Sequence, residues 1–365
     1  MSGQLVVLAA GGTGGHLFPA EALAAVLLRR EFRVALITDR RGQAFTERLP
    51  GVALHRIPAG RNGAGIVQKI AGVAEMILGT LAAARLLRRL RPVVTVGFGG
   101  YPSVPTMLAA SRRRATTIIH EQNALVGRAN RFLAPRASRI ATSFPVVHGL
   151  KQDDTTRVAM TGNPVRPEIA KHRAGSYAAP NDKINLLVTG GSQGARILST
   201  VIPEALALLP AEIKARLTLV QQARPEDVER VRDSHRRNGI EAEIASFFND
   251  IPARLDRAHL VIARSGASTV AELCVVGRPA ILVPYAHAAD DHQSFNARAL
   301  SEAGAAWVVP EHEFTPERLA ALLIDVLSSP QKLTDAANAA HSLGIPDAAE
   351  RLADLVGSYA EERAA

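Results

Sequence analysis

Short apolar runs recur along the chain, and longer stretches with apolar residues three or four positions apart separate most of them. The short runs predict buried strands, and the longer stretches predict helices. In the first half, strands are expected at residues 5–8, 34–38, 53–57, 93–96, 116–120, 140–142 and 157–161. Helices are expected at residues 18–30, 42–49 and 66–91, the last as one long helix or two, with a glycine-containing loop at 61–65.

The same alternation starts again in the second half. Strands are expected at residues 184–188, 217–221, 241–244, 260–263, 280–283 and 306–309. Helices are expected from residues 196 and 251, and at 225–238, 270–276, 290–303, 315–328 and 347–360. Repeated strand–helix units predict α/β domains in which helices cover both faces of a parallel sheet. The stretch 162–167 (Gly-Asn-Pro-Val-Arg-Pro) follows neither period, so we place the linker between two doubly wound domains there.

The first predicted strand runs into residues 9–16, Ala-Ala-Gly-Gly-Thr-Gly-Gly-His, and a predicted helix follows. Four glycines in five positions allow a tight turn and a close approach of the backbone to a ligand. The N–H groups of the helix N-terminus favour an anion such as a phosphate. His16 stands at the mouth of the turn, and an imidazole suits proton transfer near neutral pH. The structural alternatives are a turn that merely needs glycine and a histidine that only caps the helix.

A dinucleotide-binding fold competes with this interpretation. Its fingerprint is G-x-G-x-x-G with an acidic residue about 20 positions later. Residues 12–14 begin that pattern, and Asp39 ends the second strand. Leu17 occupies the position of the third glycine, which disfavours an NAD-linked oxidoreductase.

Further unusual stretches follow other predicted strands: 97–101 (Gly-Phe-Gly-Gly-Tyr), 120–123 (His-Glu-Gln-Asn), 190–195 (Gly-Gly-Ser-Gln-Gly-Ala) and 265–269 (Ser-Gly-Ala-Ser-Thr). Ligands bind at the carboxyl ends of the strands in open parallel sheets. We expect Glu272 in the first turn of the helix after residue 269, where a carboxylate can accept hydrogen bonds from vicinal ribose hydroxyls. An ordinary capping pattern explains the same spacing. Residues 290–293 open another helix, in which Gln293 can bind sugar hydroxyls.

Composition narrows the classes of protein that remain. The 365 residues suffice for two domains, 47% are hydrophobic, and Cys274 is the one cysteine, which suits a reducing compartment. Neither a signal peptide nor an 18-residue apolar run is found, so no transmembrane helix is expected. The formal net charge is +9, but only 4% of residues are aromatic and no nucleic-acid-binding motif occurs. Anionic lipid or a phosphorylated substrate explains the charge.

One predicted helix has two interpretations. Apolar residues recur in it at helical spacing, namely Ile66, Ile70, Val73, Ile77 and Leu81. Basic residues lie close by, namely Lys69, Arg85, Arg88, Arg89 and Arg91. An ordinary core helix with a basic end accounts for this pattern. A surface that rests on anionic lipid accounts for it equally well.

Taken in order, six stretches resemble the MurG family of bacterial glycosyltransferases: 11–16, 97–101, 120–123, 162–166, 190–195 and 265–272. The resemblance spans nearly the whole chain and implies a GT-B fold, with two Rossmann-like domains facing a central cleft. It implies inverting transfer of N-acetylglucosamine from UDP-N-acetylglucosamine to the 4-hydroxyl of undecaprenyl-diphospho-N-acetylmuramoyl-pentapeptide, without a cofactor. Residues 1–162 would bind the acceptor and the membrane, joined by a helix at 345–365, and residues 163–344 would bind the donor. The implied location is the cytoplasmic face of the inner membrane, near other cell-wall synthesis proteins.

The resemblance also implies site residues. Arg166 and Ser192 would contact the donor, with Arg166 near the diphosphate. Phe248 would lie near the uracil, and Glu272 would bind the ribose. Gln293 and Asn123 would bind the sugar. In the first glycine turn, Thr13, Gly14 and Gly15 would contact the donor and Gly12 the acceptor. The other acceptor contacts would be Gly99, Gly100, Tyr101 and His120. His16 is the expected general base, and Glu121 is its rival.

No metal site is expected. The chain has no Asp-x-Asp, and Ala124 replaces the second histidine of a zinc-binding H-E-x-x-H. Other GT-B enzymes that use a UDP-sugar, such as a glycolipid transferase or a UDP-N-acetylglucosamine 2-epimerase, are the nearest alternative. A non-catalytic scaffold for cell-wall enzymes is a further alternative, which the full set of polar site residues disfavours.

Overall fold

The computed structural model describes residues 3–11, 14–39, 50–59, 66–113, 115–173, 177–191 and 194–362. It divides the chain into two compact units: Met1–Arg166 with Pro346–Ala365, and Pro167–Ile345. The helix expected at 42–49 and the loop expected at 61–65 lie outside the described residues.

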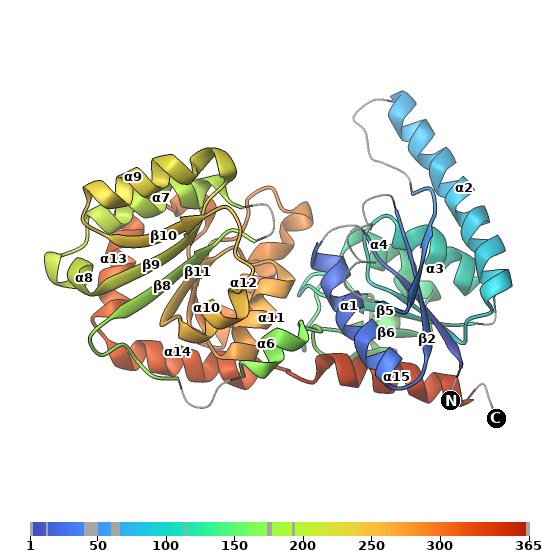
Figure 1. Cartoon of the computed structure of the whole chain (residues 1–365). Coiled ribbons are helices and arrows are strands. Elements are labelled where there is room, and N and C mark those ends of the chain that lie inside the picture. The colour runs from blue at the N-terminus through green and yellow to red at the C-terminus, as the bar shows by residue number, and fades with distance from the viewer. Residues whose placement is uncertain are drawn as a thin grey trace. The chain divides into compact units, whose positions relative to one another are not determined.

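The first unit contains a seven-stranded parallel sheet in the order β3-β2-β1-β4-β5-β6-β7 (Figure 1). The strands are β1 (Leu5–Ala9), β2 (Arg33–Thr38), β3 (Val52–Arg56), β4 (Val94–Gly97), β5 (Thr116–Glu121), β6 (Arg139–Thr142) and β7 (Val158–Met160). All seven were expected from the sequence, with ends that differ by at most two residues. The central residues of β1, β2, β4, β5 and β6 are buried on both faces, as continuous apolar runs require, whereas those of the edge strands β3 and β7 are partly or fully exposed.

Helices cover both faces of this sheet. They are α1 (Gly14–Arg29), α2 (Ile66–Leu90), α3 (Ser103–Ser111), α4 (Arg128–Leu133), α5 (Gln152–Thr155) and α15 (Ala348–Glu362), with the 3-10 turn η2 (Ala134–Arg136). Helix α2 is continuous, and α1 begins four residues earlier than expected, inside the glycine turn. Helices α3 and α4 were not expected from the sequence. Helices α1 and α15 pack on one face of the sheet, and α2 and α3 lie side by side on the other (Figure 1).

The last helix belongs to the first unit because its apolar side packs beside α1. Leu352, Ala353 and Val356 are fully buried in the same cluster as the strand residues Val6 and Leu8. Two ion pairs flank this packing, Arg29 with Glu350 at 3.0 Å and Arg30 with Asp354 at 2.6 Å. Since such exposed pairs contribute at most about 1 kcal/mol each, apolar burial is the main attachment of α15.

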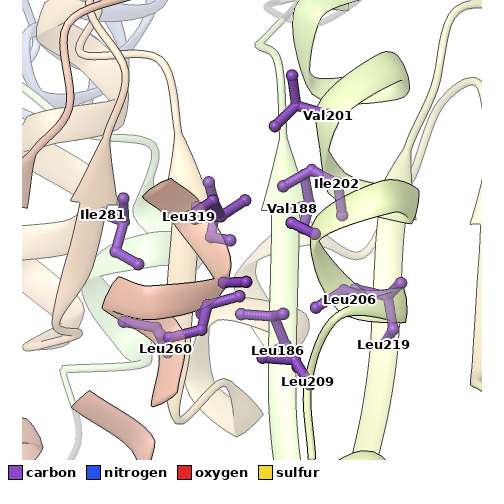
Figure 2. Close-up of a cluster of buried hydrophobic side chains, with 14 of the residues drawn as sticks. Leu186, Val188, Val201, Ile202, Leu206, Leu209, Leu219, Leu260, Ile281 and Leu319 are labelled. Atoms are coloured by element: carbon purple, nitrogen blue, oxygen red, sulfur yellow. The ribbon is translucent and has the colours of Figure 1, made fainter. Parts of the chain in front are cut away.

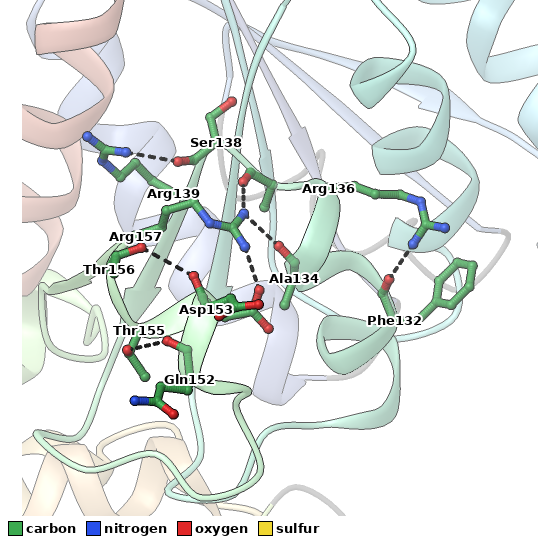
Figure 3. A network of polar contacts seen from close by, with 12 residues as sticks. Phe132, Ala134, Arg136, Ser138, Arg139, Gln152, Asp153, Thr155, Thr156 and Arg157 are labelled. Atoms are coloured by element: carbon green, nitrogen blue, oxygen red, sulfur yellow. Dashed lines mark hydrogen bonds and ion pairs between the residues drawn. The ribbon is translucent and has the colours of Figure 1, made fainter.

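A polar network secures the β6–β7 edge of the sheet (Figure 3). The Arg157 guanidinium donates to the carbonyls of Ala134 (2.8 Å) and Ala137, and it forms an ion pair with Asp154. One side chain thereby joins η2 and α5 at the edge of the sheet. An edge strand of three residues has few ladder bonds, so these contacts help to hold β7 in place.

The second unit contains a six-stranded parallel sheet in the order β10-β9-β8-β11-β12-β13. The strands are β8 (Ile184–Thr189), β9 (Leu217–Gln222), β10 (Glu241–Ala245), β11 (Leu260–Ala263), β12 (Ala280–Leu282) and β13 (Ala306–Val308). Each matches an expected strand to within one residue at either end.

Nine α-helices are described in the second unit: α6 (Pro167–Lys171), α7 (Arg196–Ala207), α8 (Ala211–Arg216), α9 (Val228–Arg237), α10 (Ile251–Arg257), α11 (Ala267–Val276), α12 (His292–Glu302), α13 (Pro316–Leu327) and α14 (Pro330–Leu343). Short 3-10 turns are η3 (Pro225–Asp227), η4 (Ala289–Asp291) and η5 (Glu311–Glu313). Figure 2 shows the core on one face, where α7 residues such as Ile202 and Leu206 face Leu186 and Val188 of β8, and Leu319 comes from α13. Helices α6, α8 and α14 were not expected from the sequence.

In each unit the strand order reverses at one place, between β1 and β4 in the first sheet and between β8 and β11 in the second. Chain connections leave toward opposite sides there, which opens a crevice at the carboxyl ends of the two strands. Glycine-containing turns follow all four of these strands. The topology thus places the four glycine motifs at the switch points, where open parallel sheets generally bind ligands.

Candidate functional site

Two glycine turns of the first unit converge on His16, the third residue of α1. A Cβ added at Gly100 would lie 3.2 Å from His16 Cδ2 and 3.3 Å from the Cα of Gly11, and one added at Gly99 would lie 3.4 Å from His16 Cε1. Gly99 and Gly100 also have φ of +80° and +74°, a conformation that favours glycine. The half-buried imidazole therefore lies against turns that follow β1 and β4, at the switch point of the sheet.

His120 lies in the same region but is fully buried. Its Nε2 is 2.9 Å from the carbonyl oxygen of Gly162, and Gln122 Nε2 is 3.1 Å from its Nδ1. A neutral ring that donates from Nε2 and accepts at Nδ1 satisfies both contacts. Burial lowers the pKa of His120 to about 4, opposed by the bond to Gly162 and assisted by the nearby His16. His120 is therefore a neutral structural link between β5 and the end of β7.

Glu121 ends β5 and is 1% exposed. Its Oε1 accepts from the Asn123 backbone N–H at 3.0 Å and from Asn123 Nδ2 at 3.2 Å. Its Oε2 accepts from the Gly127 N–H and from Asn130 Nδ2, both at 2.9 Å. The carboxylate is thus the centre of the loop that follows β5, and the half-buried Asn123 is held beside it.

Arg166, which directly precedes the boundary with the second unit, lies near the start of α1. Its guanidinium carbon is 5.3 Å from the centre of the Phe18 ring, within cation–π range. The same ring would be 3.1 Å from a Cβ added at Gly14, whereas Gly15 faces open space. Tyr101 is 42% exposed at the end of the second turn. Gly12 and Thr13 lie outside the described residues.

In the second unit, the loop after β8 closes on itself. A Cβ at Gly190 would lie 2.4 Å from the Ala195 nitrogen, and Gly191 and Gly194 have φ of +76° and +66°, so the turn needs its glycines. Gln222 at the end of β9 accepts from the Thr189 hydroxyl at 3.0 Å and from the Gly190 N–H at 3.2 Å. This loop leads directly into α7. Ser192 lies outside the part of the chain that the structure describes.

The turn after β11 leads into α11, which begins at Ala267 rather than at the expected residue 270. Gly266 is its extended N-cap residue, so Glu272 is the sixth residue of the helix. The expectation that Glu272 lies in the first turn is therefore wrong, because the helix starts within the Ser-Gly-Ala-Ser-Thr stretch. A position in the second turn, where the residue is half-buried, gains less from the helix dipole.

Gln293 connects two of these segments. Its Oε1 accepts from the Tyr285 N–H at 3.0 Å, and its carbonyl accepts from the Ser265 hydroxyl at 2.8 Å. Helix α12 begins at His292, after two aspartates, Asp290 and Asp291, with φ of +53° and +57°. The turn before α12 is thus held in a conformation that aspartate adopts more readily than most residues.

Arg264 holds the segment that follows β12 and contains Tyr285. Its guanidinium donates to the carbonyls of Val283 and Pro284 at 3.2 Å each and forms an ion pair with Glu311 at 2.8 Å. Burial raises the pKa of Glu311, but the bonds from Arg264 and from the Ala286 N–H outweigh it and hold that pKa below its usual value. Arg264 is 9% exposed, so this charge is satisfied inside the unit.

Phe248 is buried after β10, and the Arg254 guanidinium lies 4.2 Å from the centre of its ring. Arg254 also pairs with Glu243 and Asp250, each at 2.7 Å. The neighbouring Phe247 is 63% exposed. The turn that contains Phe248 is therefore fixed by an arginine that bridges β10 and the start of α10.

Several residues of these two sites were not singled out from the sequence, notably Asn130, Gln222 and Arg264. The side chain of each forms a hydrogen bond with the backbone of a strand end or of the loop that follows a strand. Arg264 directly precedes the motif at 265–269, which offers a weak signal. Asn130 is seven residues beyond the nearest motif, and no spacing rule would find it.

Helix α2 carries an exposed apolar surface, which we define as Val73, Ile77, Leu78 and Leu81. The opposite side of the helix is buried, and a Cβ at Gly79 would lie 2.0 Å from the carbonyl oxygen of Pro58. The side chains of Ile66, Lys69 and Ile70 lie outside the described residues, and Arg85, Arg88 and Arg89 are exposed. Within the described part of the chain, no helix combines the length and hydrophobicity needed to cross a membrane.

Comparison with protein families matches both units. Residues 6–142 match the glycosyltransferase family 28 N-terminal domain, and residues 185–352 match the glycosyltransferase family 28 C-terminal domain. A protein of Rhodospirillum centenum is 54% identical over 358 residues, which cover 98% of this chain and 94% of that protein. It is named UDP-N-acetylglucosamine–N-acetylmuramyl-(pentapeptide) pyrophosphoryl-undecaprenol N-acetylglucosamine transferase.

Solved structures share the architecture. Acinetobacter baumannii MurG is similar with a TM-score of 0.81 and 28% identity, and the match covers 97% of this chain and 99% of that one. A protein of Listeria monocytogenes described as a putative UDP-N-acetylglucosamine 2-epimerase has a TM-score of 0.70 at 15% identity, covering 99% and 98%. The second likeness concerns the fold alone. The two parallel-sheet, Rossmann-like units have the GT-B fold.

Proposed function

The chain belongs to glycosyltransferase family 28, and we propose that it transfers N-acetylglucosamine from UDP-N-acetylglucosamine to undecaprenyl-diphospho-N-acetylmuramoyl-pentapeptide. It is a UDP-N-acetylglucosamine-dependent hexosyltransferase of peptidoglycan synthesis. The observation that carries this assignment is the near-full-length identity with the Rhodospirillum centenum transferase. The glycine turns at both switch points agree with it, since a sugar nucleotide and a lipid diphosphate both present phosphates.

We assign the donor to the second unit and the acceptor to the first. The support in the second unit is the glycine loop after β8, which lies at the switch point, and the start of α11, whose first backbone N–H groups have no partner within the helix. On this assignment Glu272 binds the ribose, the turn at Phe248 binds the uracil, and Gln293 binds sugar hydroxyls. Gln293 Oε1 already accepts from Tyr285, so its Nε2 is the group offered to the sugar.

The reaction proposed for this site inverts the anomeric carbon in one displacement. The acceptor 4-hydroxyl forms the new C–O bond, the bond from the anomeric carbon to the UDP oxygen breaks, and the hydroxyl proton passes to a base. We assign that base to His16, because its imidazole is half-buried and lies against both glycine turns. Arg166 and backbone N–H groups stabilise the negative charge that develops on UDP.

The exposed surface of α2 is assigned to a membrane. The acceptor's polyprenyl chain stays in the bilayer, so the acceptor-binding unit has to approach lipid. The exposed apolar residues and the arginines that follow them on α2 suit insertion beside anionic head groups. We therefore place the protein at a membrane surface as a peripheral protein.

A test of the reaction type separates transfer from epimerisation. UDP-N-acetylglucosamine is incubated with the protein alone and with a lipid-linked muramoyl-peptide acceptor, and the sugar products are separated by chromatography. We expect UDP release only with acceptor present and no sugar epimerised at C2. Formation of UDP-N-acetylmannosamine, or of free N-acetylmannosamine, without acceptor would identify a 2-epimerase instead.

A further inference from the structure

The Glu121 side chain is a carboxylate buried without contact to solvent, at the end of a central strand. Burial of an ionised carboxylate is costly unless hydrogen bonds replace its lost hydration. Four neutral N–H groups supply those bonds, at 2.9–3.2 Å. A carboxylate offers about four lone-pair positions, so its accepting capacity is filled.

The four donors come from three positions along one loop, namely Asn123, Gly127 and Asn130. A single group that bonds to residues two, six and nine positions away fixes the conformation of the loop between them. Two further contacts join this loop to the rest of the site. Asn130 Nδ2 donates to the His120 carbonyl at 3.0 Å, and Gln122 Nε2 donates to the Phe98 carbonyl at 2.9 Å.

Proton abstraction by Glu121 would conflict with this arrangement. To accept a proton from a substrate hydroxyl, an oxygen would have to give up at least one of its two donors and become reachable from solvent. The loop that holds Asn123 would lose its anchor in the same step. His16, by contrast, is half-buried and lies against the glycine turns that follow β1 and β4.

We propose that Glu121 is a positioning residue, whose carboxylate holds residues 122–130 and the Asn123 side chain in the geometry needed for transfer. The proposal rests on the transferase function assigned above. It removes Glu121 from the candidates for the general base and adds Asn130 as the partner through which the loop is anchored to His120.

The first test does not depend on activity. In Glu121→Gln, an amide NH2 replaces one oxygen and faces two N–H donors, so the loop loses its anchor. Hydrogen exchange at the Asn123 and Gly127 amides should become at least about tenfold faster, with no change in the second unit. Glu204→Gln, a change at an exposed position on α7, serves as the matched control. Unchanged protection at both amides would overturn the proposal.

The second test is a double-mutant cycle on the transfer reaction. Glu121→Gln should lower kcat/KM by about tenfold or more, while the shape of its pH profile stays that of the wild type. In a variant that already carries Asn123→Ala, adding Glu121→Gln should lower kcat/KM by less than about threefold, since the main effect of Glu121 is exerted through Asn123. Additive losses, or loss of the profile's acid limb in Glu121→Gln alone, would contradict a positioning role.

The two tests separate the two claims. A wild-type protein that transfers no sugar contradicts the proposed function. The exchange measurement then decides by itself whether Glu121 holds the loop.

Discussion

His16 and His120 carry the same ring but differ in what the fold leaves them able to do. Two hydrogen bonds and full burial commit His120 to a neutral, structural role. His16 lies at the start of α1 against three glycines, and a Cβ at Gly100 would lie 3.2 Å from its ring, closer than an ordinary contact. Glycine at Gly99 and Gly100 thus serves both the left-handed backbone and the space for the imidazole.

Replacement of His16 by alanine should impair the chemical step and spare the donor site. A positioned general base contributes about 10²–10⁴-fold, so we expect kcat to fall by at least about 100-fold. The affinity for UDP should stay within about twofold, because its proposed site lies in the other unit. Steady-state kinetics and titration calorimetry measure the two quantities.

The control for this variant is His312→Ala, since His312 is exposed on η5 and remote in sequence from the motifs. That variant should behave as the wild type. Near-normal turnover in His16→Ala would remove His16 as the base.

Helix α2 differs from the other long helices in what covers it. Ala83 and Leu87 are buried against the sheet, and the bare backbone of Gly79 allows close contact with Pro58. On the outer side Val73, Ile77 and Leu78 are each more than half exposed. A helix that buries one side and exposes large apolar residues on the other is typical of an interaction surface.

Polar substitution on that outer side should release the protein from lipid. Each large side chain contributes about 1.5–3 kcal/mol when buried, so Ile77→Ser with Leu78→Ser should weaken binding to vesicles of phosphatidylethanolamine and phosphatidylglycerol at least tenfold. Co-sedimentation measures this binding.

The matched control is Leu208→Ser, at an exposed leucine after α7 in the second unit, which should bind as the wild type. Equal binding by the α2 variant and the wild type would show that this surface does not contact lipid.

The strands of both sheets could be predicted because buried parallel strands read as short apolar runs bounded by glycine or polar turns. Helices were harder to place. The α3 stretch contains a proline and has no clear polar side, so its period is weak. Helix α14 does carry a helical period, with Leu333, Ala336, Ala337 and Ala340 on its buried side, and was overlooked because most of these residues are alanines. The error at Glu272 has a local cause, since Gly266 rather than a later serine or threonine caps α11.

The site could be predicted only in part. Motifs at strand ends locate the switch-point turns, because runs of glycine and polar residues at strand ends can be recognised in the sequence itself. Burial and hydrogen bonding of a polar side chain depend on residues that are distant in the sequence. Examples are the contacts of His120 with Gly162 and of Arg264 with Glu311. The saturated carboxylate of Glu121 could not be told from a free base by sequence alone.

Taken together, the two units repeat one plan. Each sheet reverses its strand order once, and each reversal is flanked by turns that bring backbone N–H groups or polar side chains to the carboxyl ends of the strands. The fold is shared with a protein described as a 2-epimerase, so it does not define the reaction by itself. The reaction follows from family membership and from near-full-length identity with a named transferase.

The most direct test of this account is transfer of radiolabelled N-acetylglucosamine from its UDP donor to a lipid-linked muramoyl-pentapeptide in the presence of EDTA. We predict that label appears in the lipid fraction at a rate that EDTA does not change, because Arg166 and backbone N–H groups are assigned to the leaving diphosphate. Tight donor binding without labelled lipid would contradict the acceptor assignment. Absence of both donor binding and product would contradict the account of the glycine turns as phosphate sites.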